Sequence, residues 1–183
     1  MIDSKVHSNI VFSQQIEDEL RKIVRKYPAG KVFLLTDQMA AGFCLPLIQM
    51  VIDEFAIKIV TIGPGEENKN IQSIVHVWDF LSNQGADRKS LLINIGGGML
   101  TDLGGFAAST FKRGLDFVNI PTTLLAQVDA SLGGKTGFNF NGLKNEIGVF
   151  MEANSVIINT DFLKTIDREN FLSGYAEMLK HGL

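Results

Sequence analysis

The apolar residues of this chain fall into short, nearly continuous runs separated by longer amphipathic stretches, and this alternation restricts the possible fold strongly. The runs occupy residues 31–36, 56–62, 90–95, 116–120 and 155–159. Strands without polar alternation are covered on both faces, which is typical of a parallel sheet. Between the runs, helices are predicted at residues 13–26, 42–54, 70–83, 99–111 and 122–131. The alternation therefore predicts an α/β fold with a Rossmann-like, doubly wound, mostly parallel sheet.

The two ends of the chain extend this pattern in different ways. Residues 6–12 are predicted to add an outer strand. The strand pattern stops near Asp161, and residues 167–183 are typical of a helix with Asp167 as its N-cap. Because this last helix has no obvious packing partner in the sequence, we expect the chain to be a fragment of a longer protein.

Composition argues against several classes of protein. The net charge is −3 and the basic residues are spread along the chain, so no nucleic-acid partner is expected. No apolar run approaches the roughly 18 residues that span a bilayer, and the first residues lack an apolar signal core. The single cysteine, Cys44, has apolar neighbours and is predicted to be buried. A cytoplasmic protein without a membrane partner is therefore expected.

The glycine-rich stretch 96–136 indicates where a ligand binds. Gly96–Gly98 follow a predicted buried strand and precede a helix, so backbone N–H groups can approach a phosphate or dinucleotide closely. A plain turn remains the alternative. The familiar GxGxxG pattern fails, because Thr101 stands at its last glycine position. Asp102 falls in the first helical turn, where it is either a ligand or only a favourable charge at the helix start.

The second glycine loop, residues 133–136, does not match a P-loop, because Asp129 stands where that motif needs glycine and a helix-like segment precedes it. Lys135, beside two glycines, is either aimed at an anion or simply solvated, and Lys144 also follows a glycine-containing turn. Arg113 lies between a predicted helix and strand, at the sheet edge opposite the strands' carboxyl ends. Arg113 could reach a ligand at the carboxyl ends of the strands only if that ligand is bound by a neighbouring subunit, or through an unusual loop.

Metal binding is only partly indicated by the sequence. Glu177 and Lys180 are three residues apart on a predicted helix and could be an ordinary surface pair. A zinc ion would need at least two further ligands. The three histidines, His7, His76 and His181, show no ligand spacing with Glu177. The sequence therefore predicts no metal site that is complete within this chain.

The chain resembles the 3-dehydroquinate synthases in four segments, GGGMLTDLGGFAASTFKRG, IPTTLLAQVDASLGGKTGFN, LKNEIGVF and SGYAEMLKHG. The resemblance covers at least Gly63 to the end. It implies a carbon–oxygen lyase of the shikimate pathway that converts 3-deoxy-D-arabino-heptulosonate 7-phosphate to 3-dehydroquinate and phosphate. It further implies catalytic NAD, a divalent zinc or cobalt ion, and a homodimer when full length.

The resemblance also implies a division of the chain and a set of residue roles. Residues 1–160 would be an NAD-binding domain. Residues 161–183 would begin a helical domain that binds metal and substrate, and without the rest of that domain this chain would be inactive alone. Catalytic roles would belong to Asp129, Lys135, Asn145 and Lys180. NAD contacts are implied for Asp37, Glu66, Lys69, Gly97, Gly98, Met99, Leu100, Thr101, Asp102, Thr122, Thr123, Lys135, Lys144, Phe162, Leu163, Lys164 and Thr165.

Two further roles and two departures complete what the resemblance implies. Arg113 would bind the substrate phosphate in a neighbouring subunit, and Glu177 would be the one metal ligand in this chain. Thr101 replaces a usual glycine, which is expected to narrow the backbone freedom near the pyrophosphate. Pro64 replaces a usual aspartate in the second cofactor loop.

Other functions stay open on the sequence. One is a related sugar-phosphate cyclase of the 2-deoxy-scyllo-inosose synthase kind. Another is a metal-dependent polyol dehydrogenase, which is disfavoured because LLAQVDASLGGK follows PTT where such enzymes favour a GTGS-type run. A non-catalytic nucleotide-binding module is disfavoured because Arg113, Lys135, Lys144 and Glu177 occur together.

Overall fold

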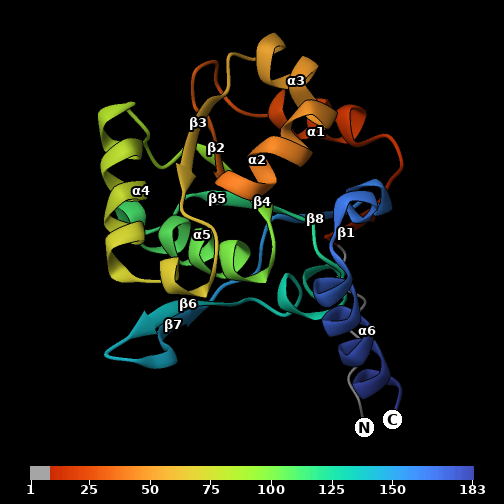
Figure 1. Ribbon diagram of the computed structural model, residues 1–183. Helices are drawn as coiled ribbons and strands as arrows, with labels where there is room; N and C mark the ends of the chain where they lie inside the picture. The colour runs from red at the N-terminus through yellow and green to blue at the C-terminus, as the bar shows by residue number, and fades with distance from the viewer. Residues whose placement is uncertain (1–8) are drawn as a thin grey trace, which may run out of the picture.

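A computed structural model describes residues 9–183 (Figure 1). Its centre is a six-stranded sheet in the order β1-β8-β5-β4-β2-β3, in which all neighbouring strands are parallel. The strands are β1 (Ile10–Phe12), β2 (Val32–Asp37), β3 (Lys58–Ile62), β4 (Leu91–Gly96), β5 (Asp116–Pro121) and β8 (Ser155–Ile158). The predicted parallel sheet is confirmed. Its predicted outer strand is confirmed at Ile10–Phe12, and residues 6–8 lie outside the described part.

Helices cover both faces of the sheet (Figure 1). One face carries α1 (Ile16–Val24), α2 (Gln38–Cys44) and α3 (Gln49–Glu54), and the other carries α4 (Ile71–Asn83) and α5 (Gly98–Thr110). Leu34 and Ile93 belong to the first core layer, whereas their neighbours Phe33 and Leu92 belong to the second. Both faces of each central strand are therefore buried, which explains why these strands have no polar alternation.

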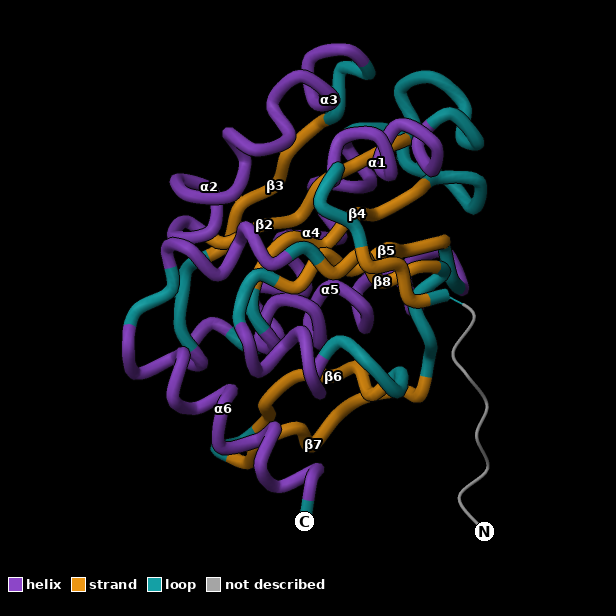
Figure 2. The backbone as a smooth tube through the Cα atoms, turned by 90° about the vertical axis from the view of Figure 1, so that its right-hand side faces the viewer, coloured by secondary structure: helices purple, strands orange, loops and turns teal. Residues whose placement is uncertain are grey.

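A β-hairpin that the sequence analysis did not predict lies on the side of α5 away from the sheet (Figures 1 and 2). Its strands are β6 (Lys135–Phe140) and β7 (Leu143–Phe150). Asn141 and Gly142 form the turn with φ values of 49° and 78°, the left-handed pair that a two-residue hairpin loop needs. Phe138 is buried against Phe106 of α5, with ring centroids 5.1 Å apart.

Two predicted helices were wrong in their extent. The helix expected at 42–54 begins at Gln38, because Asp37 caps it, and the 3-10 turn η1 (Leu45–Ile48), which contains Pro46, separates α2 from α3. The helix expected at 122–131 is mostly a π-helical turn, η4 (Ala126–Ala130). Three further 3-10 turns connect elements, namely η2 (Glu66–Asn68), η3 (Phe111–Arg113) and η5 (Thr160–Thr165).

The last helix, α6 (Arg168–Gly182), projects from the body on the same side as the hairpin (Figures 1 and 2). The predicted cap is confirmed, since Asp167 accepts a hydrogen bond of 2.9 Å from the Asn170 N–H. Gly174 packs tightly against Leu124 and Leu125. Apolar side chains on the rest of α6 are exposed, namely Phe171, Leu172, Tyr175, Met178 and Leu179. None of the helices within residues 9–183 is long and apolar enough to cross a membrane.

Candidate functional site

The parallel sheet brings the carboxyl ends of five strands, β2, β3, β4, β5 and β8, to one cleft. The connection after β2 runs to α2 on one face, whereas the connection after β4 runs to α5 on the other, so the winding reverses between these neighbours. Ligands of doubly wound sheets bind at this kind of switch point. A cleft of about 400 Å³ lies there. Its lining includes residues that the sequence assigned to NAD, namely Asp37, Gly97, Gly98, Met99, Leu100, Thr122, Thr123, Phe162 and Thr165.

The glycine loop is built for close approach at this cleft. α5 starts at Gly98, and its N-cap Gly97 supplies no side-chain hydrogen bond, so the first N–H groups of the helix are left for a ligand. A Cβ atom on Gly98 would lie 2.9 Å from the Ala130 Cβ, and one on Gly97 would lie 3.1 Å from the Thr123 Cγ2. The positive end of α5 therefore opens onto the cleft, and this arrangement fits a diphosphate.

Thr101, which was expected to contact the cofactor, lines no part of this cleft. It is buried inside the first turn of α5, where its hydroxyl donates to the Gly98 carbonyl oxygen at 3.1 Å. The backbone there is already helical, so a glycine's extra freedom is not needed. Replacing glycine by Thr101 therefore costs no backbone conformation that this helical turn uses.

Asp37 closes the other side of the cleft. Its Oδ1 accepts from the N–H groups of Met39 and Ala40 at 2.8 and 2.9 Å, which leaves Oδ2 outside both bonds. Cys44 lies beside it, and its predicted burial is confirmed. Burial, together with the nearby Asp37 charge, raises the pKa of the Cys44 thiol to about 11. The thiol therefore stays protonated near neutral pH and packs as an apolar group.

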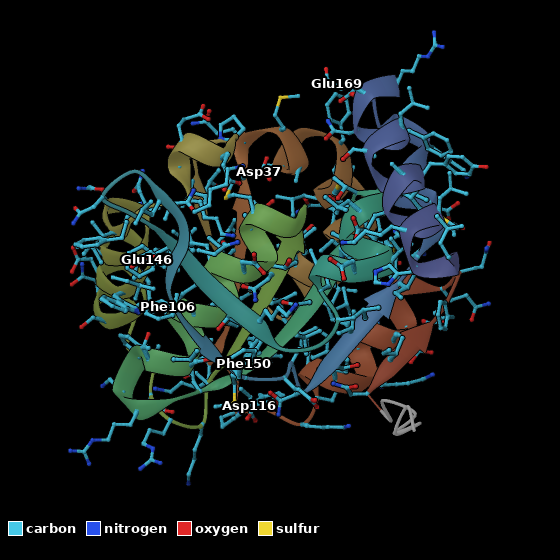
Figure 3. All side chains as sticks on the ribbon, turned by 90° about the horizontal axis from the view of Figure 1, so that it is seen from below. Asp37, Phe106, Asp116, Glu146, Phe150 and Glu169 are labelled. Carbon is cyan, nitrogen blue, oxygen red and sulfur yellow. The ribbon has the colours of Figure 1, made fainter. Side chains whose placement is uncertain are left out.

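A second cavity, of about 590 Å³, lies between α5, the π-helical turn and the hairpin. It gathers four predicted site residues, Asp102, Asp129, Lys135 and Asn145. Asp129 belongs to η4, and π-helical turns are frequent at functional sites. The hairpin adds Glu146 and Phe150, both labelled in Figure 3, which sequence reasoning missed along with the hairpin itself.

A buried ion pair links the two sides of the site. The Lys69 side chain is nearly inaccessible, and its Nζ lies 2.6 Å from Asp102 Oδ2 and also donates to Asn145 Oδ1. Burial raises the pKa of Asp102 above its usual value, and the Lys69 ammonium opposes that rise. Asp102 lies just beyond the first turn of α5 rather than in it as expected, and it lines the second cavity while the N-terminus of α5 faces the cleft, so the pair lies between cleft and cavity.

Glu66 reaches this network from the loop after β3. It is exposed, and its Oε1 accepts a hydrogen bond of 2.8 Å from Asn139 Nδ2 of the hairpin. Pro64, the second departure from the family pattern, lines the cleft itself. The loop therefore has one end at the cleft and the other at the hairpin.

Other predicted residues line neither cavity, namely Lys144, Leu163 and Lys164. Lys164 pairs instead with Asp161 at 2.7 Å. Arg113 is exposed just before β5 begins, at the opposite end of the strands from the cleft, and it lines neither cavity. The φ values of Lys112, Arg113 and Gly114 are 49°, 71° and 108°. Non-glycine residues are strained there, and such strain is typically found at functional sites.

Glu177 has a neighbour that the sequence analysis dismissed. His181 Nε2 lies 3.5 Å from Glu177 Oε1 and 3.3 Å from Asp129 Oδ1, and ligand atoms of all three lie within 4.8 Å of one another. The prediction that no histidine has a ligand spacing with Glu177 was therefore wrong, because Glu177 and His181 are four residues apart on one helix. Lys180 Nζ also contacts Glu177 Oε1, at 2.8 Å. Carboxylate and imidazole donors fit zinc or cobalt. His7 lies outside the described residues.

These features define a Rossmann-like α/β domain with a ligand cleft at its switch point. The family described as 3-dehydroquinate synthase N-terminal matches residues 59–173 of the chain. This chain belongs to that family.

Individual relatives agree with this assignment. The chain is 49% identical over 174 residues to the 3-dehydroquinate synthase of Parabacteroides distasonis, and the match covers 95% of this chain and 49% of the relative. The chain thus spans about half the length of the curated relatives it matches.

Solved structures share the fold. The 2-epi-5-epi-valiolone synthase of Streptomyces hygroscopicus subsp. jinggangensis, which has NAD+ and Zn2+ bound, matches with a TM-score of 0.83 and 26% identity, over 94% of this chain and 48% of that one. A 2-deoxy-scyllo-inosose synthase complexed with carbaglucose-6-phosphate, NAD+ and Co2+ matches with a TM-score of 0.85 over 93% of this chain and 48% of that one. At 22% identity, this second match supports the fold alone.

Proposed function

We propose that this chain is the NAD-binding half of a 3-dehydroquinate synthase. The enzyme would convert 3-deoxy-D-arabino-heptulosonate 7-phosphate to 3-dehydroquinate and phosphate, as a carbon–oxygen lyase in the cytoplasm. The observation that carries the proposal is the pair of adjoining cavities, one with a helix N-terminus and glycine loop, the other with Lys135, Asn145 and Asp129. A cofactor and a phosphorylated substrate would thus meet at Asp102. Family membership supports the same reading.

Residues 1–160 would form the NAD-binding domain, and residues 161–183 would begin a helical domain that holds metal and substrate. NAD would occupy the cleft, with its diphosphate at the start of α5 and a ribose hydroxyl at Asp37. Glu177 would hold the zinc or cobalt ion, and His181 is placed beside it. When bound, NAD supplies the hydride acceptor and the metal polarises a substrate oxygen.

The chain's own residues would bind and orient the substrate. The exposed Lys135 ammonium would attract the phosphate, and Asn145 and Asp129 would orient the ring hydroxyls across the second cavity. Lys180, beside Glu177, would contact the substrate from α6. Arg113 lines no part of this cavity, and it would bind a phosphate in the second copy of a homodimer. No nucleic acid or membrane partner is proposed.

The decisive experiment joins this chain to the remainder of its enzyme and measures phosphate release from the heptulosonate phosphate with NAD and zinc. Release is expected in the full enzyme and not in the 183-residue chain. Lys135→Ala should lower kcat/KM at least about tenfold, since a charge-assisted hydrogen bond is lost. Lys89→Ala is the matched control, because Lys89 is exposed and lines neither cavity.

Two outcomes would contradict the proposal. Steady NADH production from polyols without phosphate release would identify a dehydrogenase instead. Release of phosphate from a hexose phosphate, but not from the heptulosonate phosphate, would indicate a related sugar-phosphate cyclase. A calorimetric titration of the 183-residue chain with NAD tests the domain by itself, and no heat at millimolar NAD would contradict the cleft assignment.

A further inference from the structure

The hairpin contains an irregularity at the point where it meets the site. Phe138 pairs with Ile147 and Phe140 pairs with Leu143, so the single residue Asn139 on β6 faces residues 144–146 on β7. Asn145, in the middle of this bulge, has a φ of 53° in the left-handed region. Bulges re-aim side chains next to active sites. Here the bulge directs the Asn145 side chain to the buried Lys69 Nζ.

Asn139 holds this bulge and also contacts the loop after β3. Its Oδ1 accepts a hydrogen bond of 2.9 Å from the Asn145 N–H. Its Nδ2 donates to Glu66 Oε1 at 2.8 Å, and its backbone N–H donates to the Lys69 carbonyl oxygen at 2.8 Å. One amide side chain therefore connects two segments that are far apart in the sequence.

We propose that Asn139 is a positioning residue that couples the loop 63–70 to Asn145. This coupling rests on the proposed function for its ligands, with the cofactor at the cleft beside the loop and the substrate in the second cavity beside Asn145. Glu66 is exposed, so a ligand can reach it, whereas Lys69 is buried beneath the hairpin. A ligand that moves Glu66 would pull on the Asn139 amide and thereby alter the placement of Asn145, which faces the second cavity. Cofactor binding would thus prepare the substrate side without touching it.

A purely local role is the competing explanation, since asparagine is common in hairpins. The chain offers an internal control for it. Asn141 lies two residues further along, also in the left-handed region, and makes no side-chain hydrogen bond within the described residues. Asn141→Gly keeps the turn conformation and should leave Asn145 unchanged, whereas substitutions of Asn139 should not.

The first test measures hydrogen exchange of the Asn145 amide by NMR in the 183-residue chain without ligand. Asn139→Ala should accelerate this exchange by about 3- to 10-fold, which is the effect of losing one net hydrogen bond. The Val149 amide further along β7 should keep its rate, which separates a local change from unfolding of the hairpin. Unchanged exchange at Asn145 would overturn the assignment of Asn139.

The second test exchanges donor and acceptor between the two residues. Asn139→Asp alone places a second carboxylate against Glu66 and should also accelerate exchange at Asn145. Adding Glu66→Gln supplies an amide donor opposite that carboxylate and should restore the original rate. If Asn139 only stabilised the hairpin locally, the added Glu66→Gln substitution would not restore the exchange rate. If the double variant exchanges no more slowly than Asn139→Asp alone, the coupling is overturned.

The exchange measurements do not depend on NAD, so they can fail or succeed separately from the proposed function. In the unmodified chain, added NAD should shift the Asn145 amide resonance, and Asn139→Ala should abolish the shift while NAD still binds. If NAD does not bind but the Asn139→Asp, Glu66→Gln variant restores the exchange rate, the proposed function is contradicted. The coupling of Glu66 to Asn145 through Asn139 would still hold. NAD binding without an Asn145 shift would overturn the coupling to the cofactor.

Discussion

At the scale of single residues, one glycine decides how closely the ligand-binding helix approaches the sheet. Asn94 of β4 and Asn119 of β5 are buried side by side, with Asn94 Nδ2 donating to Asn119 Oδ1 at 3.0 Å. Gly104 of α5 lies on this pair, and a Cβ there would overlap Asn94 Oδ1, which has no hydrogen-bond partner among the described residues. The absence of a side chain at Gly104 therefore lets α5 pack close to the sheet. It thereby also sets the distance of Gly97 and Gly98, at the start of α5, from the sheet.

We predict that Gly104→Ala lowers the free energy of unfolding by about 1–3 kcal/mol, because a well-packed core must shift to accept the methyl group. Urea unfolding measures the effect. Gly42→Ala is the matched control, since Gly42 is also helical but a Cβ there meets nothing within 4 Å. It should gain roughly 0.5–1 kcal/mol from helix propensity. Equal effects at the two sites would contradict this account.

At the scale of elements, α6 depends on its N-cap, because little of the helix is packed. The backbone N–H and side-chain amide of Asn170 lower the pKa of Asp167 by hydrogen bonding to its carboxylate. A carboxyl whose folded-state pKa is lowered stabilises the fold above its unfolded-state pKa. That contribution is lost as the pH falls through the folded-state pKa.

We therefore expect the first turn of α6 to loosen only below about pH 3.9, the ordinary value for aspartate. The amide resonance of Asn170 should titrate with a midpoint below that value. Asp167→Asn should remove the titration while keeping the helix, because asparagine caps equally well without a charge. A midpoint at or above the ordinary value would show that the cap bond is absent in solution.

At the scale of the whole molecule, Lys135 lines the second cavity whereas Arg113, just before β5, lines neither cavity, so we propose that Arg113 acts in the second copy of a homodimer. We predict that Arg113→Ala and Lys135→Ala each lower phosphate release by the full-length enzyme at least about tenfold. In the proposed homodimer, mixing the two variants after unfolding and refolding should restore about a quarter of the activity, because half of the two-fold dimers would then carry one intact site. Phosphate release measures this recovery. No recovery would show that Arg113 does not act across a dimer.

Much of the fold was predictable, because burial on both faces leaves a direct trace in the sequence. β2 and β4 are mostly apolar and buried along their whole length, and Asp167 precedes its helix at the capping position. The glycine turn before α5 was predictable for the same local reason. The hairpin was also signalled, by Asn141-Gly142, but β7 is largely exposed, and neither hairpin strand has the apolar pattern that revealed the others.

The contacts within the site were less predictable. Lys69 contacts Asp102 and Asn145, which are 33 and 76 residues away in the sequence, and no local sequence pattern predicts contacts over such separations. His181 beside Glu177 could have been found from helical spacing, but Asp129 joins them only because η4 packs against α6. Asn139 carried no signal at all, since its role depends on a bulge in the opposite strand.

The sequence by itself determined the alternation of strands and helices in the main sheet, the parallel sheet and the family, because burial patterns, caps and glycine turns are local properties of the chain. Only the tertiary structure decided which polar groups meet: the Lys69–Asp102 pair beneath the hairpin, and Asn139 between Glu66 and Asn145. The physical reason is that a hydrogen bond or ion pair requires particular atoms within about 3 Å. That proximity arises only when separate elements pack against one another.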